Sequence, residues 1–163
     1  MAWVAPAAMA TVYLSPEQAL GVIFPKQRAS EFKATVLNLA KDQRKAVTAS
    51  TGLSVREQEI KLWTASDGSQ LYVDRVVGKH EFITFAVGVG ADGKVCGVEI
   101  LEYKETYGGE VRRPDWRKQF KGKQLGDGFK LGKDIINLSG ATLSSHSVTE
   151  GVQRLLAIRA LSK

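Results

Sequence analysis

The middle of the chain alternates apolar and polar residues with the period of two that is typical of β-strands. Two β-rich runs, at residues 81–90 and 94–103, flank a turn of Ala, Asp and Gly, which is a strong hairpin signal. Residues 59–64 and 70–77 flank a Ser-Asp-Gly turn in the same way, and residues 32–39 alternate enough to form a strand. The pattern therefore predicts sequential strands joined by hairpins.

Helical signals lie on both sides of these strands. Ser15, Pro16 and Gln18 stand at the cap, the first position and the third position of a short helix, which Pro25 ends. Residues 41–50 are polar and compatible with a second helix. Helices therefore flank the strands in sequence.

The last helix carries a regular apolar stripe. We expect it to begin near Ser144, although the segment from Ser147 to Glu150 is also a capping box that could set the start there. The stripe is formed by Val148, Val152, Leu155 and Leu156. Antiparallel hairpins with helices at both ends predict an α+β fold, a mostly antiparallel twisted sheet with flanking helices.

The segment between the hairpin and the last helix is less regular. Residues 116–120 have the pattern of a short helix, and Trp116 and Phe120 are expected to pack in the core, one helical turn apart. Residues 134–138 form a short extended run. Cys96, the only cysteine, is expected on the same strand face as Val98 and Ile100.

Composition excludes several classes of protein. No apolar run approaches the ~18 residues that cross a bilayer, so we expect no transmembrane segment. One cysteine and two histidines provide neither a disulfide nor a metal-ligand cluster of usual spacing. The net charge of +6 is dispersed, and nucleic acid is not expected as a partner. Residues 104–133 hold nine Lys and Arg against four Asp and Glu, which indicates either a docking surface for an acidic partner or a solvated face.

The first ten residues are apolar and end in Ala8-Met9-Ala10, the A-x-A pattern that precedes signal cleavage. No basic region precedes them. We interpret residues 1–10 as a signal-peptide remnant and residues 11–163 as a single domain; a packed or floppy N-terminal strand is the alternative.

Small residues gather just before the last helix, where they contribute little to a core. The first backbone N–H groups of a helix have no intrahelical partner, and the helix dipole adds partial positive charge there. A phosphate suits such a position, with Gly140 and Ala141 permitting close approach and with hydroxyls from Thr142, Ser144 and Ser145. Plain capping is the alternative.

The segment from Ser139 to Ser145 resembles the S-G-A-T-x-[ST]-S flavinylation motif of the FMN-binding domain family, which includes the C subunit of the sodium-translocating NADH:quinone reductase and the G subunit of the Rnf complex. The resemblance implies that FMN is joined through its phosphate to the hydroxyl of Thr142 by a phosphodiester bond. It also implies a Mg-dependent flavin transferase that uses FAD as the donor. The implied phosphate-side residues are Ser139, Gly140, Ala141, Thr142, Leu143, Ser144 and Ser145.

A second segment supports this resemblance. Residues 105–110 are similar to the family's E-T-x-G loop, which lies against the isoalloxazine ring, and residues 119–123 follow at a similar spacing. The residues implied to face the flavin are Thr106, Tyr107, Gly108 and Gly109. The FMN-binding core then spans about residues 81–160. One position departs from the family: the Asp that often stands three residues before the serine is replaced by Ile136, with Asp134 and Asn137 nearby.

These patterns together predict an exported electron-transfer flavoprotein with covalent FMN, located in the periplasm or otherwise outside the cytoplasm. The sequence indicates no catalytic residues and no metal site. We therefore expect an electron carrier, with redox partners in the membrane or outside the cytoplasm, rather than a stand-alone enzyme. A non-flavinylated docking or assembly subunit of a redox complex and a flavin-dependent reductase are the alternatives.

Overall fold

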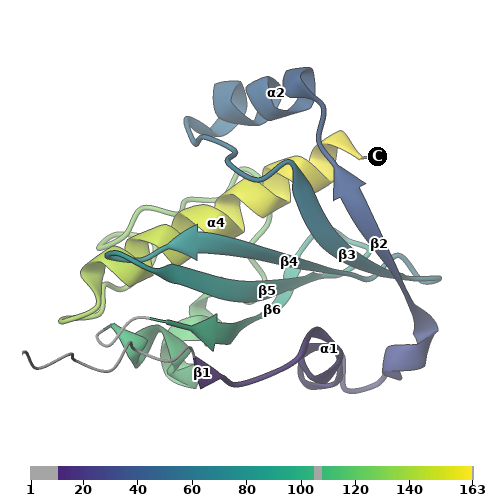
Figure 1. The fold of residues 1–163 in the computed structure, drawn as a ribbon, viewed down its shortest axis with the longest axis horizontal. Helices are drawn as coiled ribbons and strands as arrows, with labels where there is room; N and C mark the ends of the chain where they lie inside the picture. The colour runs from purple at the N-terminus through teal and green to yellow at the C-terminus, as the bar shows by residue number, and fades with distance from the viewer. Residues whose placement is uncertain (1–10, 105–107, 163) are drawn as a thin grey trace, which may run out of the picture.

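A single antiparallel sheet of six strands organises the protein (Figure 1). The structure is a computed structural model that describes residues 11–104 and 108–162. The strand order is β1-β6-β5-β4-β3-β2, so every strand but the first lies beside its neighbour in sequence. The strands are β1 (Thr11–Val12), β2 (Phe32–Asn38), β3 (Glu59–Ala65), β4 (Gln70–Val77), β5 (Phe82–Val89) and β6 (Val95–Tyr103).

Helices lie on both faces of this sheet, which confirms the predicted α+β class. The four α-helices are α1 (Pro16–Ile23), α2 (Lys41–Thr51), α3 (Pro114–Arg117) and α4 (Thr142–Leu161). The described residues also form the 3-10 turns η1 (Ala29–Glu31), η2 (Gly109–Arg112) and η3 (Lys118–Phe120). In the part of the chain that the structure describes, no helix is both long and apolar enough to cross a membrane.

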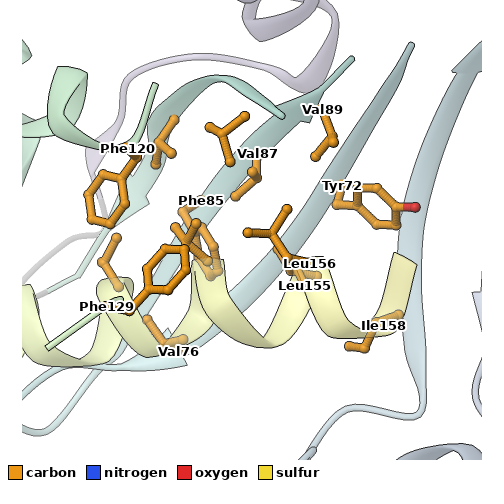
Figure 2. Packing of buried hydrophobic residues seen from close by; sticks show 14 of the residues in the cluster. Tyr72, Val76, Phe85, Val87, Val89, Phe120, Phe129, Leu155, Leu156 and Ile158 are labelled. Atoms are coloured by element: carbon orange, nitrogen blue, oxygen red, sulfur yellow. The ribbon is translucent and has the colours of Figure 1, made fainter. Parts of the chain in front are cut away.

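The larger core lies between α4 and the sheet (Figure 2). The predicted stripe of α4 supplies Val148, Val152, Leu155 and Leu156, which are all buried. They belong to one core with inward-facing side chains such as Tyr72 of β4, and Figure 2 shows Leu155 and Leu156 of α4 in that core. Each buried large apolar side chain stabilises the fold by roughly 1.5 to 3 kcal/mol relative to exposure, so this face anchors α4 along its length.

Trp116 and Phe120 belong to the same core, as predicted. They are 2% and 0% exposed, and their rings meet edge to face with centroids 5.2 Å apart. The short helical segment that holds them is thereby fixed against β6.

The smaller core covers the opposite face, where α1 packs over β5 and β6. The start of α1 matches the sequence pattern: Ser15 Oγ accepts a hydrogen bond from the backbone N–H of Gln18, and Gln18 Oε1 accepts one from the N–H of Ser15. This capping box and the Pro at the first helical position fix where α1 begins.

The prediction for Cys96 is wrong. Cys96 packs on the α1 side of the sheet, whereas Val98 and Ile100 face α4. The cause is a break in strand register: Val89 pairs with Val95 and Gly88 pairs with Gly97, which leaves Cys96 unpaired in a β-bulge. The extra residue reverses the alternation.

One boundary differs from the expectation. The last helix begins at Thr142, two residues before Ser144 and five before the capping box at Ser147, and Ser144 lies buried in its first turn. Residues 134–138 lead into this helix outside the sheet, and Ile135 makes an isolated bridge to Leu131.

Candidate functional site

The first turn of α4 has no side-chain cap. Ala141 occupies the N-cap position and has no polar side chain, and no acidic residue stands in the first turn. Gly140 precedes it with φ of +82°, in the left-handed region that favours glycine, and the N–H of Ala141 bonds to the carbonyl of Leu138. The helix therefore begins directly after this turn, and its first backbone N–H groups have no acceptor within the helix.

Thr142 is the first residue of α4, and its side chain is exposed. Leu143 next to it is 54% exposed, although it is apolar. Ser139 and Gly140 are also exposed. The residues present fit a phosphate, because an exposed hydroxyl stands beside uncapped N–H groups and no carboxylate of the first turn opposes the negative charge.

Ser144 and Ser145 bond to groups of the protein itself. Both are buried: Ser144 Oγ lies 3.1 Å from the hydroxyl of Tyr103, and Ser145 Oγ donates to the carbonyl of Ala141 at 2.7 Å. The Ser144 hydroxyl therefore ties the helix start to the end of β6, whereas that of Ser145 bonds back to the residue before the helix. Among the hydroxyl residues expected at a phosphate, Thr142 and Ser139 are exposed, whereas Ser144 and Ser145 are buried.

Gly108, from the second motif segment at residues 105–110, lies against the first turn of α4. Gly108 is buried with φ of +89°, and a Cβ there would lie 2.5 Å from the hydroxyl of Tyr103 and 2.8 Å from Ser144 Oγ. Only glycine fits this contact. Gly109 opens η2, and a Cβ there would meet no described atom within 4 Å. The structure thus brings Gly108 to the first turn of α4, while Thr106 and Tyr107 lie outside the described residues.

The segment before the motif is held by α3 and η3. Trp116 Nε1 donates to the carbonyl of Ile136 at 2.7 Å, and Gln119 Oε1 accepts from the N–H of Ile136 at 2.9 Å. The Ile136 side chain itself is 71% exposed. Asn137 follows, and its Nδ2 donates to Thr142 Oγ1 at 3.2 Å.

Asn137 lies outside the seven-residue motif, and the sequence pattern alone assigns it no role. Its spacing from Thr142 is the sequence feature that indicates the contact. Asn137 stands five residues before the threonine, and a Gly-containing turn between them folds the chain back on itself.

The basic segment 104–133 is partly neutralised within the fold. The Arg117 side chain is 14% exposed, pairs with Glu99 at 2.7 Å and donates to the carbonyl of Val98. Arg113 pairs with Asp115 at 2.6 Å, which holds the pKa of that carboxyl below its ordinary value. The exposed cations that remain include Lys118, Lys121, Lys130 and Lys133.

A separate cavity of about 300 Å³ lies between the loop at residues 52–57, β4 and α4. Asp74 and Arg154 line it, with Arg154 Nη2 3.8 Å from Asp74 Oδ2. Burial raises the pKa of Asp74, and the nearby Arg154 offsets part of that shift. Among the described residues, no group of three or more His, Cys, Asp and Glu side chains could hold a metal ion.

Comparison with known proteins points to one family. The sequence model of the FMN-binding domain matches residues 78–157. The G subunit of the ion-translocating oxidoreductase complex of Stutzerimonas stutzeri is 33% identical over 85 residues, which cover 45% of this chain and 37% of that protein. The C subunit of the Na(+)-translocating NADH-quinone reductase of Vibrio vulnificus is 40% identical over 79 residues, 38% of this chain and 31% of that protein. The chain thus matches less than half the length of these relatives.

Solved structures share the fold. The crystal structure of Shewanella oneidensis NqrC superposes with a TM-score of 0.56 over 82% of this chain and 85% of that one, at 19% identity. The corresponding Na(+)-translocating NADH-quinone reductase protein from Parabacteroides distasonis gives the same TM-score over 81% and 78% of the two chains, at 16% identity. Residues 78–157 of this protein belong to the FMN-binding domain family.

Proposed function

We propose that this protein is an electron-transfer flavoprotein that carries FMN on Thr142 through a phosphodiester bond and works outside the cytoplasm. The observation that carries the proposal is the meeting of two motif segments at the start of α4. The hydroxyl of Thr142 is exposed on an uncapped first turn, and Gly108 packs against that turn through Ser144 and Tyr103.

Attachment by a Mg-dependent flavin transferase uses FAD as the donor. Thr142 Oγ1 bonds to the phosphorus on the FMN side of FAD, the bond from that phosphorus to the bridging oxygen breaks, and AMP leaves. The threonine proton passes to a base on the transferase. The backbone N–H groups of the first turn would hold the phosphate and stabilise its charge.

When bound, FMN supplies one- and two-electron redox chemistry, and the chain supplies orientation and a local electrostatic field. Gly108 and Gly109 are proposed to let backbone groups approach the flat ring closely, since neither has a side chain, and Thr106 and Tyr107 are proposed for the same role. The named relatives are subunits of an ion-translocating oxidoreductase and of an NADH-quinone reductase, which supports a role in electron transfer.

An extracytoplasmic location is proposed from the signal-like composition of residues 1–10 and from the flavin transferase that the motif implies. A covalent tether suits that location, because lost FMN could not be readily replaced there. The redox partners are proposed to be proteins of the membrane or of the same compartment.

The test is co-expression with a flavin transferase, followed by denaturing electrophoresis and intact mass. Fluorescence should persist in the denatured band, with a mass gain of one FMN less one water. Thr142→Ala should abolish both signals, and Thr142→Ser should label partially because the hydroxyl remains.

A Thr142→Ala protein that stays covalently fluorescent would reject the site. A wild-type protein that stays colourless although a known transferase substrate is labelled in the same cells would reject covalent FMN. That result would favour a docking or assembly subunit.

A further inference from the structure

The Thr142 hydroxyl is held by a side chain outside the seven-residue motif. Asn137 Nδ2 donates to Thr142 Oγ1 at 3.2 Å, and both side chains are exposed. A hydrogen bond across five residues requires the intervening turn to be fixed. The carbonyl of Leu138, which accepts from the N–H of Ala141, and Gly140 in its left-handed conformation provide that turn.

The backbone next to Asn137 is clamped from a different part of the chain. Ile136 bonds through its carbonyl to Trp116 Nε1 and through its N–H to Gln119 Oε1, at 2.7 and 2.9 Å. Trp116 is 2% exposed and packed in the core. The peptide before Asn137 is therefore tied directly to the core, and this support extends to the Asn137 side chain through its own backbone.

We propose that Asn137 is the positioning residue for attachment at Thr142, and that Trp116 and Gln119 hold Asn137 in place. This inference rests on the proposed function. The side-chain N–H of Asn137 directs Thr142 Oγ1, and the Oγ1 proton remains available to the base on the transferase. As that proton leaves, negative charge develops on Oγ1 and the bond from Asn137 strengthens.

The bonds made and broken are those of the attachment reaction. Oγ1 bonds to the FMN phosphorus of FAD, AMP leaves and one proton is released. Asn137 is neutral and takes up no proton in this step, since an amide side chain does not titrate in the working range. The chain thus provides geometry, and the base comes from the transferase.

The experiment measures the initial rate of labelling of purified, flavin-free protein by a flavin transferase with FAD and Mg²⁺, read as fluorescence in denaturing gels. Wild type and Thr142→Ala are run first, because they test the proposed function by itself. If wild type labels only at Thr142, Asn137→Ala should then label about ten-fold more slowly at saturating FAD, since one hydrogen bond to a developing charge is lost. The matched control is Asn38→Ala, an exposed Asn on the edge strand β2, which should label at the wild-type rate.

Three further variants separate positioning from folding. Gln119 Oε1 accepts from the N–H of Ile136, and its Nε2 donates to the carbonyl of Trp116. Gln119→Glu keeps the acceptor and loses the donor, whereas Gln119→Leu removes both, so the first should retain more of the labelling rate than the second. Asn137→Asp introduces a carboxyl that titrates near pH 4, so its labelling rate relative to wild type should change with pH across that range. The ratio for Asn137→Ala should stay constant with pH.

A spectroscopic measurement completes the test without any flavin. The side-chain amide resonances of Asn137 should shift in Thr142→Ala and keep their wild-type positions in Thr142→Ser. Labelling of Asn137→Ala at the wild-type rate, with an unchanged melting temperature, overturns the proposal while leaving Thr142 as the attachment site. Absence of label on wild type overturns both.

Discussion

The starts of α1 and α4 differ although both follow a small residue. At α1, Ser15 and Gln18 exchange two hydrogen bonds, and Pro16 occupies the first position. At α4, Ala141 has no polar side chain to offer, and Thr142 exposes its hydroxyl with only Asn137 bonded to it among the described residues.

The start of α1 uses its N–H groups for stability, whereas the start of α4 leaves N–H groups free to bind a ligand. A capped start satisfies its own N–H groups and has little to offer a ligand. The start of α4 is instead held from behind, through Ser144 to Tyr103 and through Ser145 to Ala141. The turn is therefore fixed in place without using the N–H groups that lead the helix.

The largest expected difference is between a substitution at the start of α4 and one at the start of α1, compared for flavin labelling and for stability. Thr142→Ala should eliminate covalent flavin and change the free energy of unfolding by no more than about 0.5 kcal/mol, because the side chain is exposed. Ser15→Ala should leave labelling unchanged and cost about 1 kcal/mol, because a capping bond is lost. Urea unfolding and gel fluorescence of the two variants measure both effects, and a loss of label in Ser15→Ala would contradict the division of roles.

Removing the support behind α4 should have the next largest effect. Gly108→Ala places a methyl group 2.5 Å from the Tyr103 hydroxyl at a positive φ, so we expect slower labelling at Thr142. The expected loss of stability is about 2 to 4 kcal/mol, from overpacking and backbone strain together. Gly109→Ala is the matched control, since no described atom lies within 4 Å of its added carbon. Gly109→Ala should preserve both the stability and the labelling at Thr142. The larger substitution Gly109→Val should shift the visible spectrum and the reduction potential of the bound flavin. Equal destabilisation by the two Ala variants would show that Gly108 does not support the site.

In the middle of α4, Arg154 lies near the buried Asp74 of β4, so the free energy of unfolding should depend on pH. Burial raises the pKa of Asp74 in the folded state, so the folded protein binds a proton there more tightly than the unfolded chain does. The contribution of Asp74 to stability must therefore fall as pH rises from about 4 toward its raised pKa, and then level off. The free energy of unfolding of wild type minus that of Asp74→Asn, measured with urea from acid to neutral pH, should decline over that window. A difference that rises with pH would show that Arg154 outweighs burial.

The smallest expected effect concerns the lysines beside the site. Lys118 and Lys121 are exposed on and next to η3, whose Gln119 contacts the segment before Thr142. In labelled protein, changing both to Gln should slow reduction by anionic dithionite roughly two- to three-fold at low salt, and the difference should vanish as screening shortens to ~8 Å near 0.15 M salt. Lys41→Gln with Lys45→Gln removes the same charge from α2 as a control. Identical stopped-flow rates for both pairs at low salt would leave this basic segment as a solvated face.

Much of the fold follows from local pattern. The strand at residues 70–77 has the predicted bounds, and the capping box of α1 forms as expected. Such features depend on residues within a few positions of one another, whose geometry is set by side-chain alternation and by backbone groups seeking partners. The motif at residues 139–145 was recognisable for the same reason, because it is contiguous.

By itself, then, the sequence determined the α+β class, the strands β2 to β6, the apolar stripe of α4 and the segments that make up the candidate site. Tertiary structure decided the rest, including the pairing of β1 with β6. Only the β-bulge placed Cys96 on the α1 side, and only the packing of α4 against the end of β6 brought Ser144 to Tyr103. The clamp of Ile136 by Trp116 and Gln119 joins residues 17 to 20 positions apart, and its geometry depends on how α3 and η3 pack against the core. No local pattern encodes such contacts, because their distances are set by the summed packing of elements far apart in the chain.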